Sequence, residues 1–256
     1  MIRHHSRRRI LLSSTAGTAL ALLGRQSCAF AEDFYQRWPL VQPSDVLPFI
    51  RASAKQGDAE AVVTALDVWA SKYPNYGLGA EKGAILEQLF VTHAPKVALE
   101  VGSFMGYSAV RTARRLPPQG ILHCIEASAA NAAVVRQVVD YAGVGDRVDI
   151  VVGLSGDVLE DVAARIGRCD WVFLDHCKPC LLPDCLRMEQ LGIIRPGTCL
   201  VADNVLYPGA PDFLQHVQDV RLYDTELREC AFEYDTAWRE GGGKKRDAIS
   251  VSIRKA

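Results

Sequence analysis

The sequence has no marked excess of charge of either sign. Its 256 residues include 29 Lys and Arg against 30 Asp and Glu, which gives a formal net charge of −1. Proteins that mainly bind nucleic acid carry a basic surface, so this balance argues against that class. The chain also lacks the low hydrophobicity of disordered proteins, because 49% of its residues are hydrophobic. Internal repeats and linkers rich in Pro, Gly or Ser are absent too, and we expect one domain with a substantial core.

Acidic residues are missing from the first 31 positions. That segment has five arginines, fifteen uncharged residues from Ile10 to Gly24, and the small-x-small sequence Ala29-Phe30-Ala31. These are the three parts of an export signal, and Ser6-Arg7-Arg8-Arg9 resembles a twin-arginine signal. We therefore predict a leader at 1–31 that is removed at its end, a domain at 32–256, and export to a periplasm, a lumen or the medium.

A long hydrophobic run is missing as well. Fifteen uncharged residues fall short of the ~20 that a membrane-spanning helix needs, so no stable span is expected once the leader is removed. A membrane-anchored form and a mitochondrial transit peptide are the alternatives, the latter because transit peptides are also rich in Arg and poor in acids. Without the leader, 24 basic and 30 acidic residues give a net charge of −6. That charge suits a small cationic or aromatic substrate. We also expect a monomer.

A regular cysteine framework is also absent. Outside the leader the chain has seven cysteines, an odd number without even spacing. Four lie in apolar runs that are typical of strands, where cysteine behaves as a small hydrophobe: Cys124, Cys169, Cys199 and Cys230. A local disulfide among Cys177, Cys180 and Cys185 is left open.

The hydrophobic pattern changes near Pro95. Before it, apolar residues recur at three- and four-residue spacing, which predicts helices from Ser44 to about His93 with a loop at 73–77. After it we predict strands at 97–101, 121–125, 148–152, 171–174 and 198–202, helices at about 107–116, 129–143, 156–167 and 180–192, and strand-like segments at 220–227, 231–234 and 248–253. This alternation predicts an α/β fold, a Rossmann-like doubly wound sheet with extra N-terminal helices and an antiparallel C-terminal edge.

A two-glycine turn follows the first predicted strand. The sequence Glu100-Val101-Gly102-Ser103-Phe104-Met105-Gly106 lets the backbone approach a ligand closely, and Ser108 begins the next helix. The dinucleotide fingerprint G-x-G-x-x-G is not met, and Glu100 would repel a pyrophosphate. A cationic ligand without phosphates suits this turn better, and S-adenosylmethionine is one. A purely structural turn is the alternative.

Acidic and hydroxyl side chains follow the other strands. Glu126 ends the second strand, 24 residues after Gly102, where doubly wound folds place the acid that binds a ribose diol. Ser155 follows the third strand and Asp175 the fourth. Because such sheets bind ligands at the carboxyl ends of their strands, we expect these side chains at one site.

Two buried strands end directly in metal-binding residue types. The fourth runs into Asp175, and the fifth runs into Asp203 and Asn204. A buried carboxylate needs a partner, and a set of hard oxygen ligands favours Mg²⁺. Lys178, three residues after Asp175, can reach the same place, and we expect it to act as a general base.

The segment Cys177-Lys178-Pro179-Cys180 offers two alternatives. A C-x-x-C sequence occurs in thioredoxin-type redox sites, and His176, Cys177, Cys180 and Cys185 are a candidate zinc set. A redox C-x-x-C belongs at a helix N-terminus after the first strand of its fold, whereas this one follows the fourth predicted strand. An ordinary loop is therefore preferred.

Three stretches make the chain resemble the catechol O-methyltransferase family over about Ser44 to Ile253. They are LEVGSFMGYSAVR (99–111), VFLDHCK (172–178) and ADNVLYPGAPDFL (202–214), and DYAGV (140–144) supports the match. The resemblance implies a seven-stranded methyltransferase sheet. It also implies a magnesium-dependent transfer of a methyl group from S-adenosylmethionine to one hydroxyl of a small catechol substrate.

The resemblance assigns roles to individual residues. It implies a metal held by Asp175, Asp203 and Asn204, with Lys178 as the base and Glu233 as the acid that holds the second hydroxyl. The implied cofactor contacts are Leu78, Glu100, Gly102, Tyr107, Ser108, Glu126, Ala127, Ser155, Asp175 and His176. The substrate would contact Lys178, Asn204, Pro208 and Glu233.

The sequence departs from the family pattern around the substrate. Cys177 replaces the family's tryptophan beside the base, the gating tryptophan and methionine fall near Pro74 and Tyr76, and Pro208 keeps the third gate. The segment Gly241-Gly242-Gly243-Lys244-Lys245 replaces the usual hairpin. One alternative is thus an O-methyltransferase for a caffeoyl-type vicinal-diol phenol. Another is a methyltransferase-like partner or chaperone with incidental catalysis.

Overall fold

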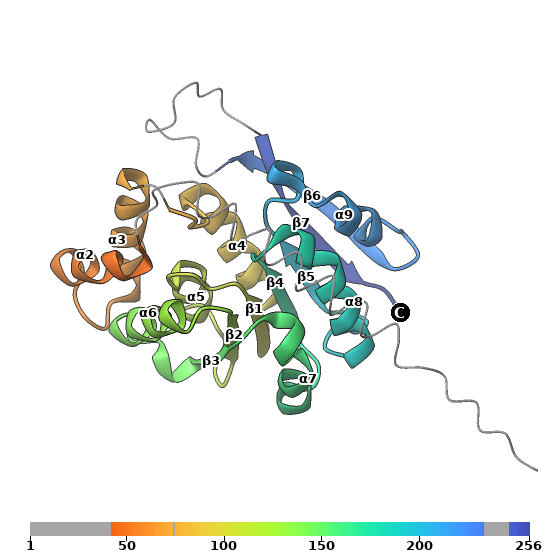
Figure 1. Cartoon of the computed structure of the whole chain (residues 1–256), viewed down its shortest axis with the longest axis horizontal. Helices are drawn as coiled ribbons and strands as arrows, with labels where there is room; N and C mark the ends of the chain where they lie inside the picture. The colour runs from red at the N-terminus through yellow and green to blue at the C-terminus, as the bar shows by residue number, and fades with distance from the viewer. Residues whose placement is uncertain (1–41, 74, 233–245) are drawn as a thin grey trace, which may run out of the picture.

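Seven strands form one sheet in the computed structural model, which describes residues 42–73, 75–232 and 246–256. The strands are β1 (Val97–Val101), β2 (Ile121–Glu126), β3 (Val148–Val152), β4 (Trp171–Leu174), β5 (Cys199–Ala202), β6 (Tyr223–Ala231) and β7 (Arg246–Arg254). Their order is β3-β2-β1-β4-β5-β7-β6. β1 to β5 are parallel, and β7 runs antiparallel to both β5 and β6 (Figure 1). The predicted doubly wound sheet with an antiparallel edge is confirmed.

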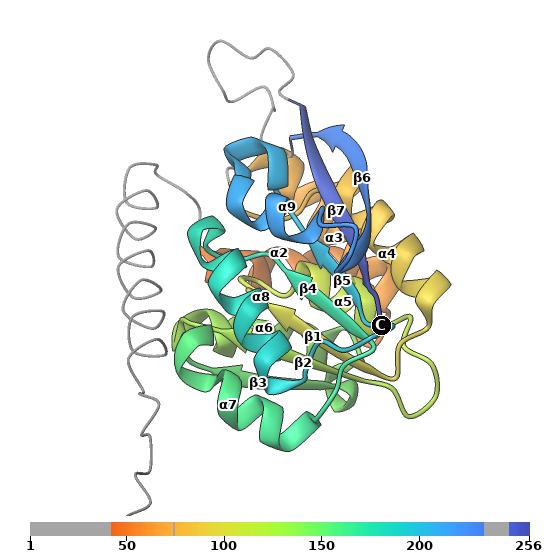
Figure 2. The ribbon, with the colours of Figure 1, turned by 90° about the vertical axis from the view of Figure 1, so that its right-hand side faces the viewer.

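Helices cover both faces of the sheet. They are α2 (Val46–Ser53), α3 (Ala59–Lys72), α4 (Ala80–His93), α5 (Tyr107–Ala113), α6 (Ala129–Tyr141), α7 (Ser155–Ile166), α8 (Leu181–Leu191) and α9 (Pro211–Val217). Residues of α2 to α6 share one buried cluster, and residues of α7 to α9 share the other. Figures 1 and 2 show these two groups of helices around the sheet. The predicted N-terminal helices therefore lie on the same side of the sheet as α5 and α6.

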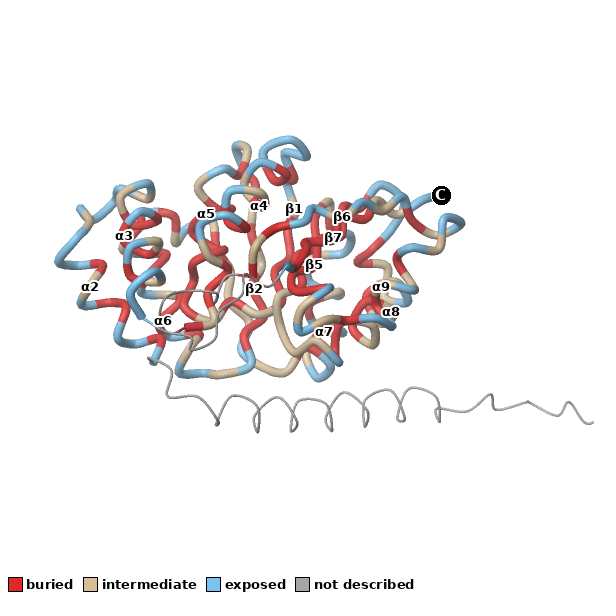
Figure 3. The backbone as a smooth tube through the Cα atoms, turned by 90° about the horizontal axis from the view of Figure 1, so that it is seen from above, coloured by how far each residue is buried: buried red, intermediate tan, exposed pale blue. Residues whose placement is uncertain are grey.

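The strands supply both clusters because successive side chains point to opposite faces. On β4, Trp171 and Phe173 pack with the N-terminal helices, whereas Val172 and Leu174 pack with α7 to α9. All four residues are buried. Figure 3 shows buried residues along the centre of the sheet and exposed residues on the outer turns of the helices. A strand buried on both faces reads as a continuous apolar run, which is why the sequence predicted this one correctly.

The C-terminal edge differs from the prediction. The prediction that a separate strand begins at Ala231 is wrong, because Ala231 is the last residue of β6 and pairs with Arg246 of β7. Residues 233 and 234 of that predicted strand lie outside the described residues. The ladder continues without a break from Tyr223 to Ala231. β6 lies at the edge of the sheet and alternates between sheltered and exposed residues, so its polar positions interrupted the apolar pattern. The predicted glycine turn at 241–243 and the leader at 1–31 lie outside the described residues.

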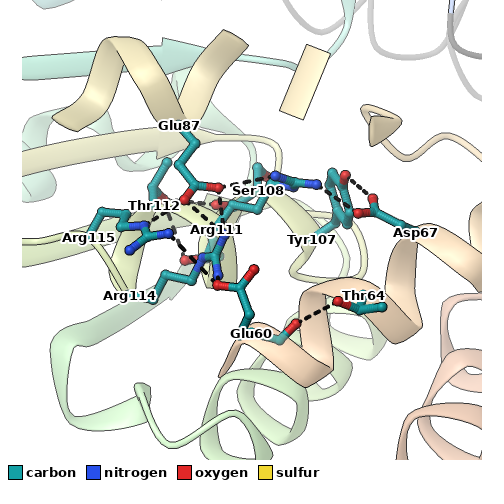
Figure 4. Close-up of polar contacts among 11 residues, drawn as sticks. Glu60, Thr64, Asp67, Glu87, Tyr107, Ser108, Arg111, Thr112, Arg114 and Arg115 are labelled. Atoms are coloured by element: carbon teal, nitrogen blue, oxygen red, sulfur yellow. Dashed lines mark hydrogen bonds and ion pairs between the residues drawn. The ribbon is translucent and has the colours of Figure 1, made fainter. Parts of the chain in front are cut away.

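A charged network joins the N-terminal helices to α5. Arg111 donates to Asp67 of α3 over 2.8 Å and to Glu87 of α4 over 3.1 Å, and the Tyr107 hydroxyl donates to Asp67. Figure 4 shows these contacts from the three helices. Gly83 of α4 permits the close approach, because a Cβ there would lie 2.6 Å from Arg111 Nε. The network holds α3 and α4 against the helix that begins at the glycine turn.

Candidate functional site

The order of the strands reverses between β1 and β4, and the glycine turn lies at this point. Gly102 follows β1 with φ at +92°, and a Cβ on it would lie 2.5 Å from the carbonyl oxygen of Asp175, which follows β4. The backbone N–H of Asp175 in turn donates to Val101 over 2.9 Å. Only glycine fits between the two strand ends. The turn predicted to bind the cofactor therefore contacts the strand end predicted to bind the metal.

Glu100 is a buried acid at the end of β1. Neither of its carboxylate oxygens makes a well-formed hydrogen bond to another described residue. Burial raises the pKa of Glu100 to about 8, and the nearby hydroxyls of Ser103 and Ser108 offset only part of that effect. A cationic group bound beside this carboxyl would favour its ionised form. The acid thus fits a positively charged ligand at the turn.

Glu126 contacts the backbone of the glycine turn directly. Its Oε2 accepts from the N–H groups of Ser103 at 3.1 Å and Phe104 at 2.8 Å. Its Oε1 accepts from the Ser128 N–H at 3.0 Å. The side chain therefore fixes the shape of the turn, a role that the spacing of residues did not reveal. Ala127, the next residue, is exposed at the end of β2.

The loop before α4 packs on the same turn. The buried Asn75 accepts from the Gly77 N–H over 2.6 Å, and a Cβ on Gly77 would lie 2.7 Å from Met105 Cε. The Tyr76 ring lies 6.0 Å from that of Phe104. Leu78, the predicted backbone contact of the cofactor, is thereby placed close to the glycine turn.

Ser155 and His176 both contact Asp184, an acid that was not predicted from the sequence. His176 Nε2 lies 2.8 Å from Asp184 Oδ2, and the Ser155 hydroxyl donates to the same oxygen. Asp184 is 6% exposed and belongs to α8. It lies between Leu181 and Met188 on the apolar face of that helix, and an acid in such a stripe is a signal that could have identified it. The Nδ1 atom of His176 is buried without a hydrogen-bond partner among the described residues.

The predicted metal ligands follow paired positions on neighbouring strands. Leu174 of β4 pairs with Ala202 of β5, and the next residues are Asp175 and Asp203. The Asp203 N–H donates to the Leu174 carbonyl over 3.0 Å. Asn204 follows at once, in the left-handed region with φ at +57°. The structure thus brings these oxygen donors to one end of the sheet, and such a donor set fits Mg²⁺.

Lys178 lies beside the first of these acids. Its Nζ is 3.1 Å from Asp175 Oδ1, and both side chains are partly sheltered, at 14% and 17% exposure. Lys178 begins the short 3-10 turn Lys178–Cys180 that leads into α8. Lys178, the predicted base, therefore lies beside Asp175, a predicted metal ligand.

The sequence pattern also did not reveal a buried charged cluster that includes Asp203. Lys82 of α4 lies 2.8 Å from Asp203 Oδ1 and 2.6 Å from Asp247 Oδ2, and all three side chains are at most 1% exposed. Asp247 also accepts from Asn204 Nδ2 over 2.9 Å. Burial acts to raise the pKa of Asp247, but Lys82 and backbone donors outweigh it and hold that pKa below its usual value.

The substrate residues are only partly described. Pro208 is exposed in the turn Val205–Gly209. The neighbouring Tyr207 ring packs edge-on against Phe232 with centroids 4.7 Å apart. Glu233, Pro74 and the segment 241–245 lie outside the described residues.

Neither cysteine alternative gains support from the described residues. Cys124, Cys169, Cys199 and Cys230 are buried as predicted, and burial raises the pKa of the Cys169 and Cys199 thiols to about 12. Cys185 is a free thiol.

The predicted zinc set does not assemble. Across residues 42–73, 75–232 and 246–256, one group of three His, Cys, Asp or Glu ligand atoms lies within 4.8 Å, and it is Cys185, Glu189 and His216. His216 Nε2 lies 2.9 Å from Glu189 Oε1, and the Tyr223 hydroxyl donates to the same oxygen. His176 is held elsewhere, by Asp184.

Comparison with known proteins decides the family. The family model described as O-methyltransferase matches residues 60–222. The chain belongs to the O-methyltransferase family. It is 38% identical to catechol O-methyltransferase of Mus musculus, over 74% of this chain and 72% of the relative. The O-methyltransferase of Bacillus cereus in complex with SAH has a similar fold, with a TM-score of 0.64 at 22% identity, over 79% of this chain and 92% of that one.

The expected enzyme class, an S-adenosylmethionine-dependent O-methyltransferase, is thereby confirmed.

The prediction of export or organelle import through a twin-arginine-like leader is wrong. The relatives of this methyltransferase include the transmembrane O-methyltransferase of Homo sapiens, which is 34% identical over 75% of this chain and 68% of the relative. The relatives offer no support for a twin-arginine leader. A basic segment followed by a short apolar run resembles such a leader by composition alone. No helix among the described residues is long and apolar enough to cross a membrane.

Proposed function

We propose that this methyltransferase transfers a methyl group from S-adenosylmethionine to one hydroxyl of a catechol, with Mg²⁺ held by Asp175, Asp203 and Asn204. One observation carries the proposal. Asp175 and Asp203 follow paired residues of β4 and β5, and Lys178 lies 3.1 Å from Asp175, at the strand end that Gly102 contacts. Relatives in Mus musculus and Bos taurus that bear the name catechol O-methyltransferase support the substrate class.

The residues around the glycine turn fit the methyl donor. Glu100 presents a buried carboxyl without a well-formed hydrogen bond, which suits the cationic end of the cofactor. Glu126, at the end of β2, suits the ribose hydroxyls. Ser155 and His176, held together by Asp184, suit the adenine. Tyr107 and Ser108 begin α5 directly after the turn. We propose Leu78, Gly102 and Ala127 as further contacts.

The chain's own residues then perform the reaction by proton transfer and positioning. Bound at the acids, Mg²⁺ would hold the catechol oxygens and lower the pKa of the phenol. Lys178 takes the phenol proton, and Asp175 keeps the ammonium in place over 3.1 Å. The glycine turn directs the methyl donor toward the phenolate, so the displacement is largely a matter of orientation. Glu233 would hold the second hydroxyl, and Pro208 would form one wall of the substrate site.

A methyl-transfer assay tests the proposal. The purified protein is titrated with S-adenosylmethionine by calorimetry and then assayed on catechol with Mg²⁺, with a chelator, and after Mg²⁺ is added back. We expect cofactor binding, turnover with Mg²⁺, loss with the chelator and recovery on addition. Turnover of a caffeoyl-type phenol but not of catechol would contradict the substrate class. Cofactor binding without turnover of either substrate would contradict the enzyme mechanism.

A further inference from the structure

Asp247 of β7 makes four hydrogen bonds at the end of the sheet that carries the proposed metal ligands. Its Oδ2 accepts from Lys82 Nζ at 2.6 Å and from Asn204 Nδ2 at 2.9 Å. Its Oδ1 accepts from the backbone N–H groups of Leu206 at 3.2 Å and Tyr207 at 2.9 Å. The side chain is fully buried. The proposed mechanism assigns Asp247 no role.

We propose that Asp247 is a positioning residue that determines which end of the Asn204 amide faces the metal. This inference rests on the proposed function, in which Asn204 is a metal ligand. An asparagine binds a cation through its single amide oxygen, whereas its NH₂ group only donates. Asp247 accepts from that NH₂ group and so directs the amide oxygen away from itself. A reversed amide would put its oxygen against a carboxylate that can only accept, and the buried NH₂ group would lose its partner.

The same carboxylate also fixes the backbone beside Asn204. Asn204 has a left-handed conformation, with φ at +57°, which is uncommon for a residue other than glycine. The two N–H groups that Asp247 Oδ1 binds belong to the turn that begins directly afterwards. Side chain and main chain of the ligand are therefore held by one group.

Lys82 makes this arrangement possible at full burial. Two carboxylates in a site closed to water repel each other unless a cation compensates them. Lys82 lies within 2.8 Å of both Asp203 and Asp247. Its single charge leaves the trio with a net charge of −1, which attracts a metal cation without leaving two acids uncompensated.

The test measures affinity for Mn²⁺, which prefers the same oxygen ligands as Mg²⁺ and is followed by its paramagnetic resonance signal. Asp247→Asn keeps the size of the side chain but replaces one acceptor with a donor. The backbone N–H groups cannot turn, so the new NH₂ group faces both Asn204 and Lys82. The Asn204 amide must then reverse. We expect Mn²⁺ to bind about 10–100-fold more weakly, which is typical for loss of a group that orients a ligand, while affinity for S-adenosylmethionine is retained.

A double-mutant cycle separates orientation of Asn204 from a general loss of charge or packing. In the Asn204→Ala background there is no amide to orient, so Asp247→Asn should lower Mn²⁺ affinity only through its lost charge, by clearly less than in the unaltered protein. An equal loss in both backgrounds would overturn the inference. Ser252→Ala is the matched control, because Ser252 is also buried on β7 and its hydroxyl contacts Thr225 instead, over 3.0 Å. It should leave Mn²⁺ affinity unchanged.

A swapped pair keeps the idea testable if Asp247→Asn does not fold. Asp247→Asn combined with Asn204→Asp preserves the charge and reverses the hydrogen bond, and position 204 then offers a carboxylate oxygen in either orientation. Mn²⁺ affinity near that of the unaltered protein supports the inference, and its loss overturns it. If the unaltered protein does not bind Mn²⁺, the proposed metal site fails and the inference falls with it. If the unaltered protein and Asp247→Asn bind Mn²⁺ equally, only the inference fails.

Discussion

Gly102 and Asp175 are in backbone contact across the point where the sheet reverses its strand order. A Cβ on Gly102 would approach the Asp175 carbonyl oxygen to 2.5 Å. Gly102 belongs to the turn proposed to hold the methyl donor, and Asp175 is proposed to hold the metal. The two halves of the site are therefore coupled through main chain alone, without an intervening flexible side chain.

Gly102→Ala should damage both halves of the site. The φ of +92° costs about 1–3 kcal/mol for a residue with a Cβ, and the clash displaces Asp175 in addition. We expect a lower free energy of unfolding and weaker binding of both S-adenosylmethionine and Mg²⁺, measured by denaturant titration and calorimetry. Gly197→Ala is the control, because Gly197 has a similar φ of +91° but open space around its Cβ position. Gly197→Ala should lose stability alone, and normal ligand binding by Gly102→Ala would refute the coupling.

Glu100 should make the cofactor-free protein less stable as the pH rises. The folded protein keeps the Glu100 proton up to a pKa of about 8, whereas the unfolded chain releases it near 4.5. The folded state thus binds more protons between these values, and this group lowers stability by up to about 1.4 kcal/mol per pH unit there. Glu100→Gln removes that contribution, so its unfolding free energy should fall less between pH 5.5 and 7.5. Equal slopes for both proteins would contradict the prediction.

Lys178→Ala should lower kcat by about 10²–10⁴-fold, the usual contribution of a general base. Affinity for S-adenosylmethionine should be nearly unchanged, since Lys178 contacts Asp175 in the proposed metal site. Lys178→Arg keeps a positive charge beside Asp175 but cannot release a proton, so it should lose turnover as well. Full activity of Lys178→Arg, or a large loss of cofactor affinity in Lys178→Ala, would refute the role of Lys178 as the base.

Asp184→Asn should weaken cofactor binding more than it lowers kcat. Asp184 accepts from the Ser155 hydroxyl and lies 2.8 Å from His176 Nε2, so its loss frees two proposed adenine contacts. We expect the dissociation constant for S-adenosylmethionine to rise about tenfold, which corresponds to about 1.4 kcal/mol. Glu189→Gln is a matched control on α8, since Glu189 contacts His216 and Tyr223 instead. Equal cofactor affinity of the two variants would rule out the role of Asp184.

Most of the fold was predictable because its pattern is local. Trp171–Leu174 reads as one apolar run because the strand is buried on both faces. The edge strand β6 was misjudged at its end because half of its residues face water. The ends of β1, β2, β4 and β5 were predicted as a site because parallel strands direct their carboxyl ends to the same edge.

The contacts of Glu126, Lys82 and Asp247 were not predictable from the pattern, and for Asp184 the pattern marks a buried acid but not its partners. Each reads in the sequence as a single charged residue near an apolar stretch. Their partners are distant in the chain, and Lys82 and Asp247 are separated by 165 positions. A hydrogen bond between such residues depends on the packing of α4 against the sheet, which no local periodicity records.

The amino-acid order alone was thus sufficient to identify the strand-helix alternation and the glycine turn and to predict a set of oxygen ligands, since backbone preference and burial act over a few residues. Three-dimensional packing was needed to show how these groups are oriented. It placed Gly102 against Asp175, bound the glycine turn to Glu126 and turned the Asn204 amide toward Asp247. Orientation depends on hydrogen bonds between elements that meet only in the folded chain.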